Sequence, residues 1–394
     1  MNHLNSNEDI QPRDIGLEFL SPNSEWKIFD ENKETLSQQL LAAMQMQNII
    51  VLAGCGTSLG TVGGPSMKTL WNCCMKEKNN YTSTATGVAQ QLKYNISEEE
   101  QVNIEEFLSL CEAYLQINDD DQLVREFLTS CKQKIISACS YEKNTEAMEG
   151  HRTFVHRLSR RRVRDSRLKL FTTNYDTCFE EAASFHGIVV IDGFSFSFPR
   201  QYEPRFFDLD IVRRINSASP TDNYLEGVFQ LYKLHGSVNW EKQTNGSIIE
   251  REATPDNACM IFPAKGKYQQ SYIQPHLELM ARYLASLRDP NSCLIITGFG
   301  FNDDHLAAPI ISAIQTNPHL KVIIADYNAK NNVMGENENA SQHWEKLKAL
   351  HNQGEDILFI NSTFQEFAKI IPDLRSLSPA EKMVNAIQSI SGVQ

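Results

Sequence analysis

Leu231-Tyr-Lys-Leu-His-Gly-Ser237 is the stretch around which we expect the fold to be organised. Its apolar residues are typical of a short buried strand. The strand ends at His235, followed by a glycine that frees the backbone and a serine that can hydrogen-bond it. One imidazole is thereby predicted at the carboxyl end of a strand, where open α/β sheets place their ligands.

Three other apolar runs also break at small or polar residues. They are Gly54-Cys-Gly-Thr-Ser58, Thr172-Thr-Asn-Tyr-Asp176 and Gly298-Phe-Gly-Phe-Asn-Asp-Asp304. Because parallel strands end at one edge of a sheet, we expect the four stretches to converge on one nucleotide site. A glycine turn between a strand and a helix lets backbone N–H groups approach a pyrophosphate. The first turn lacks the dehydrogenase spacing and its acidic partner, so a plain tight turn stays an alternative.

Short apolar runs alternate with helical patterns along the rest of the chain. Such runs lie at 48–53, 168–171, 188–191, 293–297, 321–325 and 357–360, with a hairpin arm at 247–251 and a short strand at 260–263. This alternation predicts an α/β fold with a doubly wound, Rossmann-like parallel sheet of about six strands.

The pattern of apolar residues along the chain predicts four segments. Residues 36–83 and 165–372 form the α/β domain, and residues 84–164 form a helical insertion. The insertion carries no obvious chemistry, so we interpret it as a lid or an assembly surface. Residues 1–35 form an N-terminal arm that packs on another subunit, or a disordered tail. Residues 373–394 form a C-terminal helix or tail.

Composition narrows the class of protein. The 394 residues, 41% hydrophobic and 22% charged, have an ordinary globular composition. The net charge of −12 argues against direct nucleic-acid or anionic-membrane binding. One basic run, residues 157–167, carries six arginines. A solvated helix end or a subunit contact is favoured over an anionic partner for this run.

The cysteines indicate a reduced, cytoplasmic protein without a zinc module. There are nine, with no Cys-x-x-Cys pair, whereas structural zinc needs two close pairs. The polar start at 1–14 has no apolar signal core, and no apolar run is long enough to span a bilayer.

Taken together, the four motifs resemble those of sirtuins over about residues 45–370. Residues 54–58 are similar to the sirtuin phosphate loop, Gly-Ala-Gly-x-Ser. Residues 173–176 resemble the Thr-Gln-Asn-Ile-Asp stretch, and 234–237 resemble the catalytic His-Gly. Residues 298–305 are closer to the late nucleotide loop of bacterial sirtuin-like proteins than to that of deacylases.

The chain differs from sirtuin deacylases in two respects. The chain lacks their four-cysteine zinc module, and Gly63-Gly-Pro-Ser66 stands where they carry Ile-Pro-Asp-Phe-Arg. It is more similar to the sirtuin-like NADases of bacterial anti-phage defence, which hydrolyse NAD⁺. Because no fused sensor domain is expected, the chain resembles the short subunits that assemble with a HerA-type hexameric ATPase. This resemblance implies NAD⁺ as substrate, no zinc, and a homo-oligomer.

The proposed chemistry assigns roles to three side chains. An imidazole titrates near ~6.5, so His235 can act as a base toward water or a ribose hydroxyl; the sequence does not choose between them. Asn174 is expected to orient the water or the ribose. Asp176 is expected to bind a ribose hydroxyl or to stabilise positive charge, with simple helix capping as the alternative.

Ten further residues are predicted to hold the dinucleotide. The first loop is expected to bind the phosphates, and the late loop is expected to approach the adenosine ribose. Residues after the last two strands are expected to line the adenine end. The set is Gly54, Gly56, Thr57, Ser58, Thr173, Gly298, Phe299, Asp326, Thr363 and Phe364. Asp303 or Asp304 is interpreted as a helix cap, and His305 as a packing residue.

Two other functions remain open from the sequence. One is a protein deacylase or ADP-ribosyltransferase that uses the same glycosyl chemistry with another nucleophile. The other is a non-catalytic module that binds NAD⁺ or ADP-ribose.

Overall fold

A computed structural model describes residues 16–59, 62–97, 102–141, 146–161, 165–213, 224–263 and 273–374. Three parts of the sequence-based predictions lie outside these ranges. They are the start of the predicted arm at 1–15, nearly all of the predicted C-terminal helix or tail at 375–394, and two arginines of the basic run, Arg162 and Arg164.

A nine-stranded sheet in the order β2-β1-β14-β13-β12-β3-β6-β8-β7 forms the centre of the fold. The strands from β14 to β7 all pair in parallel. The strands are β1 (Glu18–Leu20), β2 (Lys27–Ile28), β3 (Asn48–Ala53), β6 (Leu168–Thr172), β7 (Val189–Ile191), β8 (Val228–Lys233), β12 (Ser292–Thr297), β13 (Leu320–Asp326) and β14 (Ile357–Asn361). The predicted α/β fold with a largely parallel sheet is confirmed, with more strands than the expected six.

The two extra edge strands come from the segment predicted to be an arm. β1 pairs antiparallel with β14, Phe19 opposite Ile360, and β2 pairs with β1. Phe19 is fully buried in the core of the same chain. The segment thus covers the open hydrogen-bonding edge of β14, which would otherwise be exposed.

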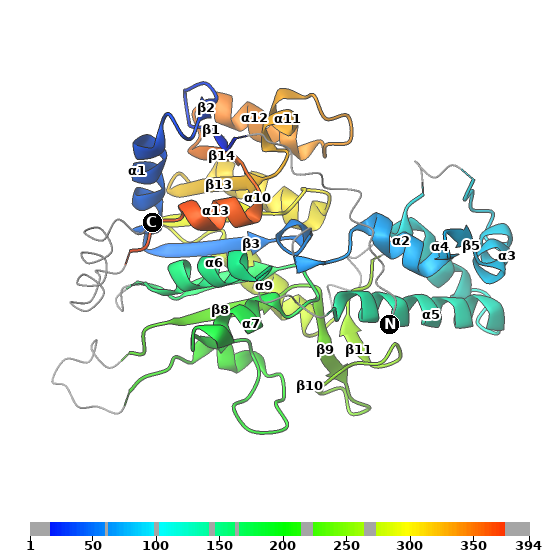
Figure 1. The fold of residues 1–394 in the computed structure, drawn as a ribbon. Coiled ribbons are helices and arrows are strands. Elements are labelled where there is room, and N and C mark those ends of the chain that lie inside the picture. Colours follow the sequence, from blue (N-terminus) through cyan, green and yellow to red (C-terminus); the bar gives the residue numbers. More distant parts are fainter. Residues whose placement is uncertain are drawn as a thin grey trace.

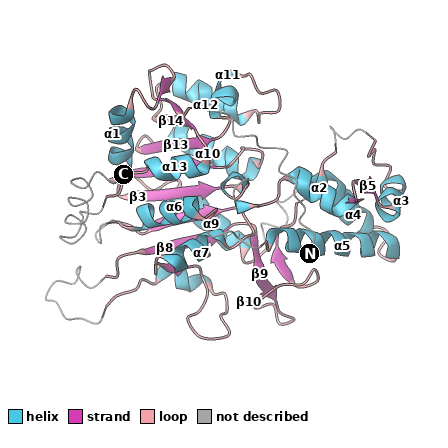
Figure 2. Ribbon diagram, viewed as in Figure 1, coloured by secondary structure: helices cyan, strands magenta, loops and turns pink. Residues whose placement is uncertain are grey.

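Helices cover both faces of the sheet (Figures 1 and 2). One face carries α1 (Lys33–Met44), α6 (Glu149–Ser159), α7 (Cys178–Phe185) and α13 (Phe364–Ile370); the other carries α9 (His276–Ser286), α10 (Asp304–Thr316), α11 (Ala329–Met334) and α12 (His343–Asn352). Residues of β3 alternate between the two cores: Ile49 and Val51 face α1, while Ile50 and Leu52 face α9 and α10.

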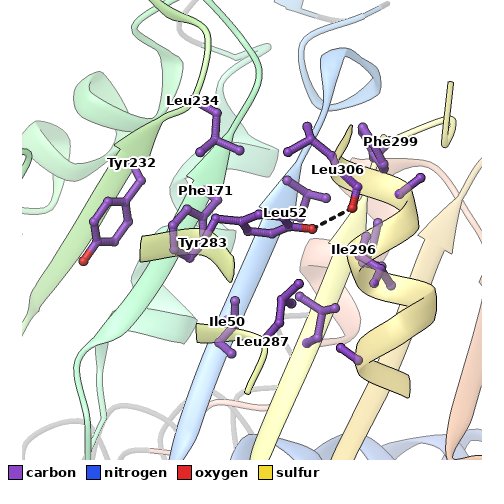
Figure 3. Close-up of a cluster of buried hydrophobic side chains, with 14 of the residues drawn as sticks. Ile50, Leu52, Phe171, Tyr232, Leu234, Tyr283, Leu287, Ile296, Phe299 and Leu306 are labelled. Carbon is purple, nitrogen blue, oxygen red and sulfur yellow. Dashed lines mark hydrogen bonds between the residues drawn. The ribbon is translucent and has the colours of Figure 1, made fainter. Parts of the chain in front are cut away.

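The core beneath α9 also anchors the loop that follows β12. Figure 3 shows Phe299 and Leu306 in the same buried cluster as Tyr283. The Tyr283 hydroxyl donates to the carbonyl of Leu306 over 3.1 Å, which satisfies a polar group inside an apolar cluster. Phe171 stacks on Tyr232 at 4.5 Å in this cluster, so the ends of β6, β8 and β12 share one packed support.

Four helices form a separate helical unit to one side of the sheet, beyond the carboxyl end of β3 (Figure 1). They are α2 (Met67–Met75), α3 (Ser83–Gln91), α4 (Ile104–Leu115) and α5 (Gln122–Cys139). A short hairpin, β4 (Lys76–Glu77) with β5 (Asn80–Tyr81), joins α2 to α3. Trp71 and Phe107 meet at 5.8 Å in the core of this unit.

The boundaries of this unit differ from the predicted 84–164. α2 packs into the unit, whereas α6 packs on α7 and α13 against the sheet. Helical periodicity identifies an apolar face but not the surface that the face will cover, which is why sequence reasoning missed the difference.

The described arginines of the basic run bind the protein's own backbone and carboxylates. Arg161 donates to the carbonyls of Met44, the last residue of α1, and of Met46 and Gln47 just beyond it. Arg157 donates to carbonyls at the end of α13. Arg167 pairs with Asp210 at 2.8 Å. Cations at helix carboxyl ends satisfy carbonyls that have no partner within the helix.

A small sheet, in the order β10-β9-β11, follows the large one directly after His235. It comprises β9 (Gly236–Lys242), β10 (Ile248–Glu250) and β11 (Ala258–Met260). β10 lies within the predicted hairpin arm, and β11 begins and ends earlier than the predicted strand at 260–263. Among the described residues, no helix has both the length and the apolar character needed to cross a membrane.

Candidate functional site

The site lies at the point of the large sheet from which strands are added in both directions. β3 has β12 on one side and β6 on the other, and later strands add outward from each. The loops after β3 and β12 touch: the Gly54 N–H donates to the Thr297 carbonyl over 3.0 Å, and the Gly56 N–H to the Gly298 carbonyl over 2.9 Å. Open α/β sheets bind ligands at such a switch point.

A cavity of about 1190 Å³ opens at this edge. One wall consists of strand-end residues: Cys55, Ser58, Thr173, Asn174, Tyr175, Asp176, His235, Gly298, Phe299, Gly300, Asn302 and Asp303. The facing wall comes from the helical unit and the segments beside it: Met67, Leu70, Trp71, Val102, Asn103, Ile104, Glu105, Cys139 and Tyr141. All four sequence motifs therefore reach one cavity, as predicted from their places at strand ends.

The amide of Asn174 is held in a single orientation. The Thr57 hydroxyl donates its proton to the Gly54 carbonyl over 2.8 Å, so it must accept from the Asn174 Nδ2 at 3.0 Å. Nδ2 also donates to the Ser58 hydroxyl over 3.1 Å. The Asn174 Oδ1 is buried and accepts no hydrogen bond from any described residue. A buried acceptor without a donor is costly, so it favours a bound donor at this point of the cavity.

Asp176 is held in place by a hydrogen bond from the start of the next helix. Its Oδ1 accepts from the Cys178 N–H over 3.0 Å at the start of α7. Burial alone would raise the carboxyl pKa, but the Lys233 ammonium and the bonds from Cys178 outweigh it and lower the pKa. Asp176 therefore stays charged while it lines the cavity. It also bonds the first N–H of α7, although the capping position of that helix belongs to Thr177 and not to Asp176.

Lys233 holds the loop after β6 in place. Its side chain is 2% exposed, and its ammonium pairs with Glu180 at 2.9 Å. It also donates to the carbonyls of Tyr175 and Asp176. A buried cation at the end of β8 thus fixes the loop after β6, which carries Asn174.

His235 occupies the turn from β8 into β9. The Ile261 N–H donates to its carbonyl over 2.9 Å, and the His276 Nδ1–H donates to the Leu234 carbonyl over 3.0 Å. Gly236 follows with a φ of 81°, and a Cβ there would lie 2.0 Å from the Cys259 carbonyl oxygen. Only glycine fits, and the turn directs the imidazole of His235 into the cavity wall.

The predicted dinucleotide residues divide into two groups. Ser58, Thr173, Gly298 and Phe299 line the cavity. Gly54, Gly56 and Thr57 lie behind it: a Cβ at Gly56 would be 2.7 Å from the Gly298 Cα, so these glycines serve the contact between loops. The helix expected after this loop is present as α2, which begins at Met67 after the capping Ser66, and a single helical turn, Cys55–Thr57, precedes it within the loop.

The residues predicted for the adenine end are not among those that line the cavity. Asp326 ends β13, where its carboxylate accepts from the Asn328 N–H over 2.8 Å and burial raises its pKa to about 6. Thr363 caps α13, and Phe364 packs at 4.8 Å on the ring of His151. A position after a strand indicates the correct edge of the sheet, but not the distance along that edge.

Sequence reasoning missed several residues of the cavity wall. Tyr175 lines it and donates from its hydroxyl to the Ile261 carbonyl over 2.6 Å. Asp303 occupies the capping position of α10, as expected, but its carboxylate lies near His235. Trp71 and Glu105 come from the helical unit, whose sequence shows only apolar periodicity.

Part of the chain is similar to known proteins. No curated protein matches the chain. A solved Sir2 homologue, a triple mutant in complex with 2′-O-acetyl ADP ribose, is 12% identical with a TM-score of 0.43, covering 85% of this chain and 94% of the other. A Sir2 homologue–NAD complex is 13% identical with a TM-score of 0.42, covering 85% and 91%. Residues 168–350, somewhat under half of the chain, match the family model described as a SIR2-like domain, and this stretch contains three of the four motifs.

Proposed function

We propose that the protein is an NAD⁺ glycohydrolase, which cleaves the bond between nicotinamide and ribose to give nicotinamide and ADP-ribose. One observation carries the proposal: the oriented amide of Asn174, with a buried acceptor oxygen, lines the same cavity as His235. The match to a SIR2-like domain supports NAD⁺ as the substrate.

The residues supply what this glycosyl transfer needs. The bond breaks through an oxocarbenium-like state, and nicotinamide leaves as a neutral group. Asn174 Oδ1 accepts from the attacking water or from a ribose hydroxyl and so orients it. His235 accepts the proton that the water loses as it adds to the ribose carbon, or takes the proton of the ribose hydroxyl. The charged Asp176 lies in the same wall and favours the positive charge that develops on the sugar.

A second candidate uses the same chemistry with another nucleophile. The facing wall contributes the apolar side chains of Met67, Leu70, Trp71 and Val102. Such a surface suits an acyl-lysine or other protein acceptor, as a deacylase or ADP-ribosyltransferase requires. An acceptor peptide that accelerates nicotinamide release and is itself modified would favour this candidate over hydrolysis.

The resemblance to defence NADases motivates a cellular role. We propose that the protein depletes NAD⁺ as an anti-phage, abortive-infection effector in the cytoplasm. It would act as a homo-oligomer with a HerA-type ATPase and without direct nucleic-acid contact. Co-purification with such an ATPase, and NAD⁺ loss in infected cells that requires His235, are the expected results.

The activity is tested with the purified full chain, alone and with that partner, by following nicotinamide release from NAD⁺. His235→Ala should lower the rate by about 10²–10⁴-fold, the usual value of a positioned base. Asn174→Ala should also lower it strongly, because the water or the ribose is then no longer oriented. His351→Ala and Asn317→Ala are matched controls, since the described hydrogen bonds of both side chains are to backbone groups away from the cavity. Wild-type rates in both cavity variants would refute the assignment.

A further inference from the structure

Asp303 does not cap its own helix with its side chain. It occupies the capping position of α10, yet its carboxylate accepts no bond from the amides of the first turn. Asp121 at the start of α5 shows the usual arrangement, accepting from the Val124 N–H over 3.0 Å. The charge of Asp303 is directed instead toward two imidazoles.

Those imidazoles come from two different elements of the fold. The Nε2 of His235, at the turn after β8, lies 3.8 Å from the Asp303 Oδ2. The Nδ1 of His305, in the first turn of α10, lies 3.7 Å from the Asp303 Oδ1. The three ligand atoms lie within 4.8 Å of one another. The distances to Asp303 exceed a direct hydrogen bond, so the carboxylate stands between the rings with room for a bridging group.

From this geometry we propose that His235, Asp303 and His305 bind one divalent transition metal, with Zn²⁺ as the best match. Two imidazole nitrogens and one carboxylate oxygen are a ligand set that Zn²⁺ and its neighbours in the first transition row accept. Ligands at about 2.1 Å from a tetrahedral ion lie about 3.4 Å apart. The three ligand atoms lie within 4.8 Å of one another, so binding requires the side chains to close by at most about 1.4 Å.

The site is of the open kind. All three side chains are at least four-fifths buried, which holds them in place, and two of them, His235 and Asp303, also line the cavity. The remaining coordination position therefore faces the cavity and would carry water or an anionic ligand. Sequence reasoning missed this arrangement, because His235 is separated from Asp303 by 67 intervening residues and lacks any metal-binding spacing.

Metal binding has a consequence for the proposed hydrolase, and this step rests on the proposed function. A metal on Nε2 occupies the lone pair with which His235 would accept a proton. The metal-bound protein should therefore be held inactive, and removal of the ion should release the activity. Metal binding itself does not depend on whether the protein hydrolyses NAD⁺.

Binding is measured first, on the full chain after chelator treatment, by calorimetric titration with Zn²⁺ and by the visible absorption of Co²⁺. We expect one equivalent bound through nitrogen and oxygen, without the intense thiolate absorption that the nine cysteines would give. Asp303→Asn and His305→Gln should each weaken binding at least tenfold. His343→Gln is the matched control, because it removes a buried histidine that contacts the neighbouring carboxylate, Asp304, at 2.8 Å.

The outcomes separate the two proposals. Binding that survives in both cluster variants, or a thiolate spectrum, would overturn the metal site, provided that thermal melts show the variants folded. If binding is confirmed, nicotinamide release is compared with and without Zn²⁺ for each protein. At least tenfold inhibition of the wild type, lost in His305→Gln, supports the regulatory step. Metal binding without any NAD⁺ turnover leaves the site standing and counts against the hydrolase alone.

Discussion

Replacement of Lys233 by methionine should destabilise the protein strongly and disturb the loop that carries Asn174. The ammonium of Lys233 is buried with a 2% exposed side chain and pairs with Glu180, which is 27% exposed, at 2.9 Å. Methionine fills a similar volume but donates nothing to Glu180 or to the carbonyls of Tyr175 and Asp176.

The expected cost follows from the groups left behind. Removal of one partner of a buried ion pair costs about 3–5 kcal/mol, and the partial exposure of Glu180 reduces this to about 2–4 kcal/mol. Burial already raises the pKa of Glu180 in spite of the neighbouring Lys233. Without the lysine this pKa rises further, so the carboxyl takes up a proton at low pH and the cost is relieved there. The free energy lost should therefore be larger at pH 8 than at pH 5.

Chemical unfolding followed by circular dichroism at both pH values measures this loss. Lys169→Met is the matched control: it removes a lysine from neighbouring β6, where Lys169 pairs with Asp289 at 2.8 Å with side chains 25% and 38% exposed, and it should cost under about 1 kcal/mol. Adding Glu180→Gln to Lys233→Met should recover part of the stability. A Lys233 variant as stable as the Lys169 variant at both pH values would refute the reasoning.

Two further predictions concern pH. Burial lowers the pKa of His276 from 6.5 to about 4 despite its bond to Leu234, so the stability due to this neutral ring is present above pH 6.5 and is lost toward pH 4. The loss is about 3 kcal/mol, and His276→Gln should remove this part of the unfolding profile. Burial raises the pKa of Asp326 from 3.8 to about 6, so its contribution falls as pH rises through that range. Asp326→Asn should therefore stabilise the protein at pH 7 by about 3 kcal/mol in thermal or chemical unfolding, and no gain would contradict the raised pKa.

The convergence of the four motifs was predictable because it depends only on strand direction. Each motif follows a buried run, and the carboxyl ends of parallel strands share an edge whatever the loops do. His235 and Asn174 were located by this reasoning, and both line the cavity. The prediction of the helical insertion also depended on local information, since helical periodicity is visible without tertiary contacts.

Which residue each side chain contacts was not predictable, because the contacts join residues that are distant in sequence. Asp303 was interpreted as a cap and does hold that position, but His235, from another strand, lies near its carboxylate. The sequence places Arg161, with the rest of the basic run, at a solvated helix end or a subunit contact, whereas its side chain binds the carbonyls after α1. Phe364 was assigned to adenine and packs on His151. In each case the residue type was read correctly, and only the fold decided which neighbour it met.

The contact between the two glycine loops allows a last prediction that separates two costs of adding one methyl group. Gly298 has a φ of 59°, and a Cβ there would lie 2.5 Å from the Thr57 nitrogen. Gly246 has a φ of 86° with nothing within 4 Å of its Cβ, so Gly246→Ala reports the backbone cost alone, about 1–2 kcal/mol. Gly298→Ala should cost more by whatever the loops need to separate, and should weaken NAD⁺ binding, whereas Gly246→Ala should not. Equal losses of stability and unchanged affinity in both variants would mean that the two loops move apart freely, and the switch-point contact would then not shape the cavity.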